Sequence, residues 1–214
     1  MPDDKKRHVQ RKPQREVVDK SDIYKILDEG KVAHIGLIDA DEPVVVPMGY
    51  VRDGDSILLH GSTGTRLFLK LKEAPTICAT VTLLDDIIVA RSAFNSSMNY
   101  RSVMAFGIPK ILEGKVKKLA LNKITDGLVP GFSKVARPMT NKEIAQTMIV
   151  RLELDQASAK QRTGGASDDP EDIELNAWAG RLPLKKGFDM PITNDDSKVR
   201  EIPEWIHKIV EDAK

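Results

Sequence analysis

The sequence has little of several residue types, and each shortage excludes a class of protein. It contains one cysteine, Cys78, which excludes an internal disulfide framework and which we expect to be a buried, inert thiol within the apolar run APTICATVTLL. The four histidines show no metal-ligand spacing. No apolar run approaches the ~18 residues that a membrane-spanning helix needs, and no apolar signal segment opens the chain. We therefore expect a cytoplasmic protein without a metal site and without a membrane partner.

Net charge is also nearly absent. The 33 basic residues are balanced by 32 acidic ones, so no overall field favours nucleic acid as a partner. Residues 1–16, MPDDKKRHVQRKPQRE, are an exception, because they are basic, contain two prolines and have few apolar side chains. No aromatic residue is interleaved among these basic residues for base stacking, so we interpret them as a flexible, solvated arm.

The apolar residues that are present follow the spacing of short strands and a few helices. With 214 residues and 41% hydrophobic content, the chain can bury a sizeable core. SDIYKILDEG predicts a helix that Ser21 caps and Gly30 ends, Lys31 to Ala40 predicts a strand, and Asp53-Gly54 predicts a hairpin turn. Further strands are expected at Thr76 to Leu83, Ile87 to Ser92 and from Tyr100 onward. This pattern indicates a small antiparallel barrel rather than a doubly wound sheet.

The second half of the chain adds helices and a long loop. The patterns predict a helix over Val116 to Leu128, a helix opened by the capping box at Thr140, a strand over Met148 to Leu154, a loop over Ala157 to Pro170, a strand over Ala177 to Leu184 and a helix over Pro203 to Ala213. We divide the chain into the arm (1–16), a barrel domain (17–190) and a C-terminal extension with a short helix (191–214).

One stretch combines groups that suit an anion. HGSTGTR, residues 60–66, holds three hydroxyls, two glycines and a guanidinium just before an apolar run that predicts a helix. The first turn of a helix has unpaired N–H groups, so the stretch is a candidate phosphate cradle. The alternative is structural, with Ser62 or Thr63 capping the helix and the glycines forming a loop. The spacing matches neither a P-loop nor a dinucleotide fingerprint.

Three stretches carry a resemblance to a known family: the hairpin that ends in HGSTGTR, the segment SMNYRSVMAFG and the late AWAGRLPL. With the order of the elements, they make residues 20–185 resemble the FMN-binding split-barrel superfamily. The likeness is to pyridoxamine 5′-phosphate oxidase-like flavin-nucleotide-binding proteins, including the branch of the nitroimidazole-resistance nitroreductases. The resemblance implies a mainly β fold with peripheral helices (α+β), a six-stranded antiparallel split barrel. It also implies a homodimer with FMN in each of two clefts between protomers.

The resemblance also implies a site, residue by residue. Val45 to Met48 match the strand that runs under the flavin ring. Leu59 and His60 match the end of the next strand, near the ribityl chain. Thr65 and Arg66 match the positions that hold the phosphate. The family often has two adjacent basic residues at the phosphate site, whereas this chain has only Arg66. We therefore expect Ser62, Thr63 or Lys70 to support Arg66 in binding the phosphate. The cofactor-binding residues so assigned are Val45, Val46, Pro47, Met48, Leu59, His60, Ser62, Thr63, Thr65, Arg66, Arg101, Ser102 and Trp178.

Two functions fit this site equally well. The first is an oxidoreductase that passes electrons from NADH or NADPH through FMN to a small planar or nitroaromatic compound, with His60 or Tyr100 as proton donor. The second is a flavin-binding protein without turnover, such as a flavin carrier or a redox-responsive partner. Pyridoxamine phosphate oxidation is disfavoured, because neither Arg181 nor Lys185 matches the family's later arginine cleanly. Haem binding is a minor third hypothesis, since no convincing axial ligand is evident.

Overall fold

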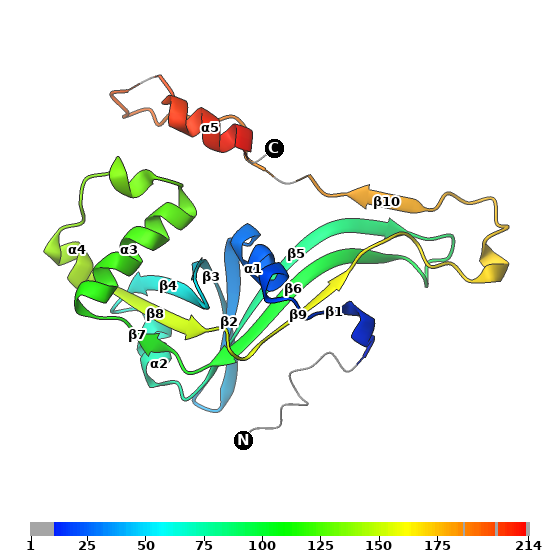
Figure 1. Cartoon of the computed structure of the whole chain (residues 1–214), viewed down its shortest axis with the longest axis horizontal. Coiled ribbons are helices and arrows are strands. Elements are labelled where there is room, and N and C mark those ends of the chain that lie inside the picture. The colour runs from blue at the N-terminus through cyan, green and yellow to red at the C-terminus, as the bar shows by residue number, and fades with distance from the viewer. Residues whose placement is uncertain (1–10, 186, 200, 213–214) are drawn as a thin grey trace.

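The computed structural model describes residues 11–185, 187–199 and 201–212, and its centre is a twisted antiparallel barrel (Figure 1). Its strands are β1 (Glu16–Val17), β2 (Val32–Asp39), β3 (Glu42–Asp53), β4 (Ser56–Ser62), β5 (Ile77–Val89), β6 (Ser97–Gly107), β7 (Lys110–Ile111), β8 (Thr147–Glu153), β9 (Ala157–Arg162) and β10 (Gly180–Pro183). Its helices are α1 (Lys20–Glu29), α2 (Arg66–Glu73), α3 (Gly114–Leu128), α4 (Asn141–Gln146) and α5 (Glu204–Asp212), with short 3-10 turns η2 (Pro13–Arg15), η3 (Phe132–Lys134) and η4 (Pro170–Asp172).

The strands form one continuous sheet that folds back on itself. Its order is β1-β9-β6-β5-β2-β3-β4-β8-β7, and β10 pairs with the far end of β5. The predicted fold class is confirmed, although the described residues contain more strands than the six expected. Six strands have seven or more residues, namely β2 to β6 and β8, and the additional ones are shorter.

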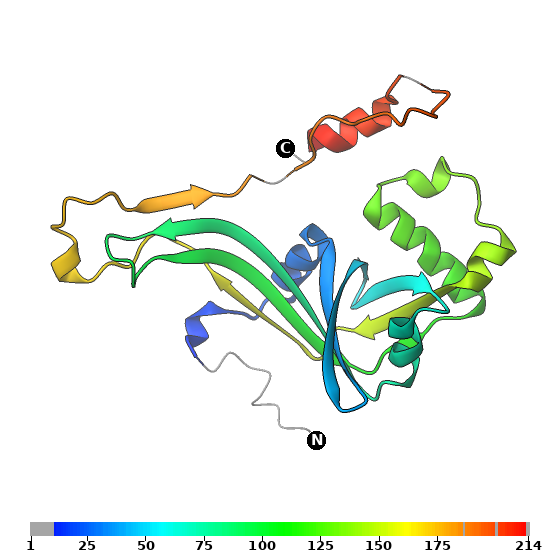
Figure 2. The ribbon, with the colours of Figure 1, turned by 180° about the vertical axis from the view of Figure 1, so that it is seen from behind.

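Strand β3 bends between two parts of this sheet. Its first part, Glu42 to Gly49, pairs with β2, and its last part, Tyr50 to Asp53, pairs with β4. Strands β5 and β6 extend beyond the barrel as a long hairpin, and β10 runs beside the end of that hairpin (Figures 1 and 2). The chain then returns to α5, where Trp205 stacks on Phe132 of η3 at 5.9 Å between ring centroids.

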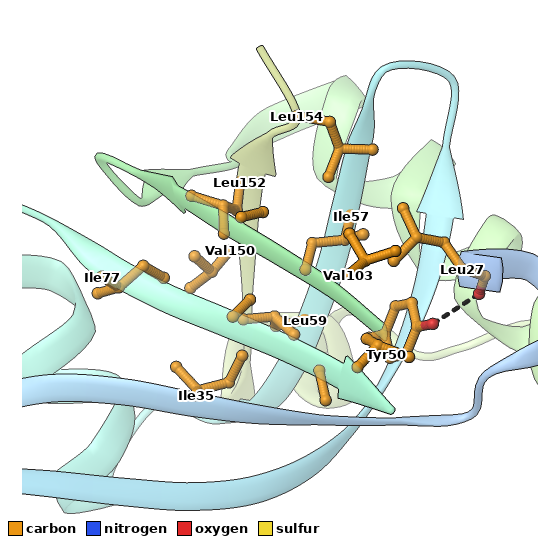
Figure 3. Packing of buried hydrophobic residues seen from close by; sticks show 14 of the residues in the cluster. Leu27, Ile35, Tyr50, Ile57, Leu59, Ile77, Val103, Val150, Leu152 and Leu154 are labelled. Atoms are coloured by element: carbon orange, nitrogen blue, oxygen red, sulfur yellow. Dashed lines mark hydrogen bonds between the residues drawn. The ribbon is translucent and has the colours of Figure 1, made fainter. Parts of the chain in front are cut away.

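The main core lies inside the barrel. It is built from alternate residues of the strands, including Ile35, Leu59, Val103 and Leu152, with Leu27 of α1 closing one side (Figure 3). The buried hydroxyl of Tyr50 donates a hydrogen bond to the carbonyl oxygen of Leu27 at 2.6 Å, so α1 is attached to β3 by a polar contact as well as by packing.

A second, smaller core lies outside the barrel. Helix α3 packs Ala120, Leu121 and Ile124 against a sheet surface formed by Val51, Leu58 and Ile149. Its remaining face is turned to solvent. Neighbouring α4 begins with the predicted capping box, in which Thr140 and Glu143 bond each other's backbone N–H groups.

Three local predictions were wrong. The strands expected at Thr76 to Leu83 and Ile87 to Ser92 are one strand, β5, with a register shift between Leu84 and Asp86. The first part of the expected loop, Ala157 to Arg162, is strand β9, which pairs with β6 through backbone groups despite its polar side chains. The N-cap of α1 is Asp19, whose carboxylate accepts from the Ser21 N–H, whereas the expected stop at Gly30 is confirmed.

The predicted domain limits stay predictions. Residues 1–10 of the expected arm lie outside the described residues, while Glu16 already belongs to β1 and pairs with Lys160. The extension contains the expected helix, α5, of which Ala213 lies outside the described part. Among the helices in the described ranges, none has the length and hydropathy that crossing a bilayer requires.

Candidate functional site

The first part of β3 has one edge without a strand partner among the described residues. The turn Ala40-Asp41, with both φ angles positive, closes the β2–β3 hairpin at the pair Asp39 and Glu42. In such a hairpin, every second pair of facing residues exchanges backbone hydrogen bonds, beginning with the pair Asp39 and Glu42 next to the turn. The hydrogen bond from the Tyr50 N–H to the Lys31 carbonyl shows that the same alternation still holds at the other end of the hairpin. The even-numbered residues of β3 therefore bond to β2. The odd-numbered ones, from Pro43 to Gly49, direct their backbone groups to the free edge.

This alternation divides the predicted flavin strand. Val45 and Pro47 present backbone groups to the free edge, and their side chains lie on the outer face of the sheet. Val46 and Met48 lie opposite Ile35 and Ala33, so their side chains point into the barrel and their backbone groups are engaged with β2. Only the odd-numbered pair can offer hydrogen bonds to a bound molecule at this edge, with the Val45 N–H as a donor.

The predicted phosphate cradle lies at the start of α2. The first N–H groups of a helix have no partner within the helix. In α2 the preceding residue, Thr65, makes no side-chain cap to them either. The Thr65 hydroxyl donates to the Ser62 carbonyl at 3.0 Å, and the Thr63 N–H donates to the Gln146 carbonyl at 3.0 Å. The structural alternative, a helix capped by Ser62 or Thr63, is therefore not what is observed.

Arg66 is connected to the β2–β3 hairpin through Asp39. Its Nε and Nη2 both donate to Asp39 Oδ2, at 3.0 and 2.7 Å, while Lys70 approaches the other oxygen at 2.9 Å. Lys70 and Arg66 hold the pKa of Asp39 below its usual range. The Asp39 side chain is 5% exposed and that of Arg66 is 82% exposed, so the carboxylate fixes a guanidinium that remains open to solvent. The contact also brings the cradle to the end of the β3 free edge.

Leu59 and His60 point in opposite directions from β4. The side chain of Leu59 is fully buried in the barrel core, so it lines no surface. His60 lies opposite Ile149, on the side of the sheet that α3 covers. Its Nδ1 is buried without a hydrogen-bond partner, and burial lowers the pKa of the imidazole below its ordinary value.

The predicted residues of β6 are likewise divided between two faces. Arg101 makes paired hydrogen bonds with Asp85 and with Glu29 of α1, and these carboxylates raise its pKa. Ser102 and Tyr100 lie on the opposite, outer face, across from Thr82 and Leu84. Arg101 is thus tied to structural partners, while Ser102 and Tyr100 share the face of Val45.

The outer face of the sheet carries apolar as well as polar side chains, and none of the described residues covers it. It carries several exposed large side chains on β2, β3 and β6, namely Val32, Ile38, Val45 and Met104. Several exposed large apolar side chains on one face of a sheet are typical of an interaction surface.

Trp178 lies far from the cradle of its own chain. It precedes β10, where Gly180 pairs with Val89 at the distal end of β5. Gly36 of β2 pairs with Cys78 near the other end of β5, and Asp39 lies still farther along. Eleven residues of β5 separate these points, which is about 36 Å along a strand at ~3.3 Å per residue. Trp178 is 63% exposed and cannot contact Arg66 within one chain.

Two further observations limit what else the chain can hold. A cavity of about 560 Å³ opens between Pro75, Phe106, Ile108, Lys110 and Gln156, and none of the predicted site residues lines it. In the part of the chain that the structure describes, no group of three or more His, Cys, Asp or Glu side chains could hold a metal ion.

Comparison with known proteins identifies the family. The profile described as pyridoxamine 5′-phosphate oxidase matches residues 19–161, which is about two thirds of the chain. The chain belongs to the pyridoxamine 5′-phosphate oxidase family. This confirms the resemblance found in HGSTGTR, SMNYRSVMAFG and AWAGRLPL, although the last stretch lies beyond the matched residues. Among curated proteins, none matches this family member significantly.

Two solved structures are similar over almost the whole chain. The flavocytochrome Anf3 from Azotobacter vinelandii is 36% identical, with a TM-score of 0.88, and the match covers 95% of this chain and 96% of that one. An FAD and heme binding protein from Mycobacterium smegmatis is 32% identical, with a TM-score of 0.88, covering 92% and 97%. A protein from Bacteroides thetaiotaomicron described as a 5-nitroimidazole antibiotic resistance protein is 21% identical, with a TM-score of 0.59, covering 68% and 86%; it supports the fold alone.

Sequence reasoning missed Asp39, which connects the cradle to the β3 edge. The sequence placed Asp39 only at the end of the strand expected over Lys31 to Ala40, and nothing in its spacing indicates Arg66 as its partner. A signal does exist in retrospect, because a carboxylate at the end of an otherwise apolar strand is buried only when it is paired.

Proposed function

We propose that this protein binds a flavin nucleotide along the free edge of β3, with its phosphate at the cradle of Ser62 to Arg66, and that it takes part in electron transfer. The observation that carries the proposal is that two sets of backbone groups without hydrogen-bond partners among the described residues lie next to each other. A strand edge with backbone groups unused by the sheet meets an uncapped helix start that carries an arginine. Hydrogen bonds to a flavin ring and to a phosphate would use both.

The chemistry of the cradle suits a phosphate. Arg66 commits two of its nitrogens to Asp39 and retains Nη1, while the first N–H groups of α2 and the Thr63 hydroxyl add donors. Arg66, Lys70 and Asp39 together carry one formal positive charge. FMN is the form that this cradle predicts, because its terminal phosphate matches one arginine at one helix start. FAD is the form named for the M. smegmatis relative.

The site is completed by a second copy of the chain in this proposal. Trp178 cannot reach the cradle of its own chain, and the outer sheet face with Val45 and Met104 is uncovered. A two-fold dimer would cover this face and bring one protomer's Trp178 to the other's β3 edge. Mixing Arg66→Ala with Trp178→Ala protomers should then restore one intact site per heterodimer, whereas sites built from one chain would gain nothing.

A bound flavin would supply the electron or hydride transfer itself. The chain would position the ring through the Val45 backbone and exclude water with the partner's surface. Tyr100, which lies on the outer face of the sheet with Val45, is the proposed proton donor, whereas His60 lies on the side that α3 covers and does not reach this edge. NADH or NADPH is the proposed reductant and a small planar or nitroaromatic compound the acceptor. The alternative remains a flavin carrier without turnover.

The decisive experiment concerns Arg66. The purified protein should be yellow or take up added FMN, and a colourless protein that binds none would end the proposal. Arg66→Ala should weaken FMN by roughly 10- to 100-fold, because hydrogen bonds to charged groups contribute about 1.5–3 kcal/mol, and should change riboflavin affinity little. Arg137→Ala is the matched control, since Arg137 is also an exposed arginine paired with one carboxylate. Equal loss for FMN and riboflavin would mean that Arg66 supports the fold only.

Two further measurements separate the remaining choices. Mass spectrometry of the released cofactor distinguishes FMN from FAD. Anaerobic addition of NADH or NADPH should bleach the flavin of an oxidoreductase, and absence of bleaching with both would favour the carrier.

A haem is the second candidate ligand. The observation in its favour is the naming of the two relatives above 30% identity as a flavocytochrome and an FAD and heme binding protein. Histidines His34, His60 and His207 lie in the described ranges and are the ligands to test. A Soret band after haem addition that disappears in one His→Ala variant would support haem binding, and an unchanged haem spectrum without protein-dependent shift would refute it.

A further inference from the structure

Positive charge is concentrated in the segment 113–146, which we call the helical lobe and which contains α3, η3 and α4. The lobe carries seven basic residues against three acidic ones, an excess of four, whereas the whole chain has an excess of one. The basic residues are Lys115, Lys117, Lys118, Lys123, Lys134, Arg137 and Lys142. The rest of the protein therefore has an acidic excess of three, part of which lies on α5, the helix that contacts the lobe where Trp205 stacks on Phe132.

Most of this charge is not neutralised locally. Of the three acidic residues, Glu143 is paired with Arg137, whereas Asp126 accepts hydrogen bonds from the neutral Ser133 and attracts Lys134 without an ion pair. Lys123 is paired with Asp53. The other five lysines have no ion pair within the ranges that the structure describes, and these are Lys115, Lys117, Lys118, Lys134 and Lys142.

The exposed face of α3 combines these lysines with an apolar centre. Ala120, Leu121 and Ile124 point into the second core, so the opposite side of the helix faces solvent. There Leu119 is 64% exposed and Val116 is also exposed. Lys115 lies one turn before Leu119, and Lys118 lies beside it. An apolar centre with a charged rim is the composition of a small, transient protein interface.

Other anionic partners fit this face less well. A helix that lies in a bilayer surface needs a broad apolar face, and the broad apolar face of α3 is already buried against the sheet. Single-stranded nucleic acid would need aromatic side chains for stacking, and α3 contains none. A protein surface rich in carboxylates is the partner that a lysine rim selects.

The lobe also lies close to the proposed flavin strand. Helix α3 packs on Val51 of β3, three residues beyond Met48 and six beyond Val45, which corresponds to roughly 10 and 20 Å along the strand. A protein docked on this lobe would thus be placed beside the strand that would hold the ring.

We propose that the exposed face of α3, centred on Leu119 and flanked by Lys115 and Lys118, docks an acidic one-electron carrier protein that reduces the flavin in place of a nicotinamide cofactor. The electron-transfer part of this inference rests on the proposed flavin function. Each docked carrier loses one electron, so two reduced carriers and one proton from water reduce one flavin by two electrons.

The probe is a plant-type [2Fe–2S] ferredoxin with an acidic surface. Direct binding of the oxidised ferredoxin is measured by calorimetry at low and high salt, and flavin bleaching by the reduced ferredoxin is followed by stopped flow. A variant with Lys115→Gln and Lys118→Gln should bind and react at least about tenfold more weakly at low salt, and the difference should shrink at high salt. A control with Lys31→Gln and Lys198→Gln removes the same charge from exposed positions elsewhere and should behave like the parent.

The outcomes are separable from those of the flavin proposal. Binding uses no flavin, so loss of binding in the lobe variant supports the docking surface even if the protein proves colourless. Equal binding by parent and lobe variant would overturn it, as would equal losses in the lobe and control variants. Lysine-dependent binding to phosphatidylserine vesicles without binding to ferredoxin would refute the protein partner in favour of a membrane.

Discussion

Gly61 is the position where a single methyl group should most directly disturb the cradle. It lies at the end of β4, and a Cβ placed there would lie 2.2 Å from Cε2 of Phe68 and 2.8 Å from Cδ2. Ordinary contacts between carbon atoms begin near 3.5 Å, so the overlap exceeds about 1 Å. Phe68 belongs to α2 and is 3% exposed within the core, so its ring cannot move away without disturbing its core neighbours. The methyl group must therefore displace α2, which carries Arg66 and the free N–H groups.

Gly61→Ala should lower the free energy of unfolding by about 1–3 kcal/mol, the range for overpacked cores. For a chain of this length, that corresponds to a fall in Tm of roughly 2–12 °C. FMN affinity should fall as well, because the phosphate donors move with the helix. Urea unfolding and FMN titration measure both quantities.

A double-mutant cycle tests the cause. Phe68→Leu removes the ring edge that the new methyl group would meet, so Gly61→Ala should be less costly in a Phe68→Leu background than in the parent. The expected coupling is at least about 0.5 kcal/mol. If the two changes add without coupling, or if Gly61→Ala leaves both stability and FMN affinity unchanged, the steric argument is refuted.

Two further predictions concern single side chains. Leu59→Ala should lower the free energy of unfolding by about 2–5 kcal/mol, because Leu59 is fully buried. The substitution should leave the ratio of FMN to riboflavin affinity unchanged. A selective loss of FMN affinity would contradict the assignment of Leu59 to the core. Cys78 was predicted to be buried but is only half-buried, and this partial burial raises the pKa of its thiol. Its reaction with a disulfide reagent should therefore be slower at pH 8 than that of a free thiol and should accelerate at higher pH than usual. A half-maximal rate at or below the ordinary pKa would contradict burial as the controlling factor.

The sequence predicted those features that depend on local spacing. The helix that follows HGSTGTR, the stop at Gly30 and the capping box at Thr140 each follow from residue types within one turn. The family resemblance was equally local, because it rested on three short stretches. These parts of the fold and of the cradle could therefore be predicted from the sequence alone.

Properties that depend on tertiary contacts were not accessible. In PVVVPMGYV every residue but one is apolar or proline, so periodicity alone could not tell that Val45 faces outward and Val46 inward. The strand β9 was missed because its pairing uses backbone groups, and its residues ASAKQR carry no β-strand pattern. The partnership of Asp39 with Arg66 joins residues 27 positions apart, and Trp178 could be placed at the far end of β5 only once its register was known.

The two prolines of β3 have a consequence for the solubility of the protein. A strand edge left open for a ligand is also a template on which foreign strands can assemble into aggregates. Pro43 and Pro47 occupy alternate positions along this edge and have no N–H to donate. An intruding strand would find only half of the donors that it needs, whereas a small molecule that requires one N–H would find it at Val45. Replacing both prolines with alanine would therefore remove a protection against aggregation.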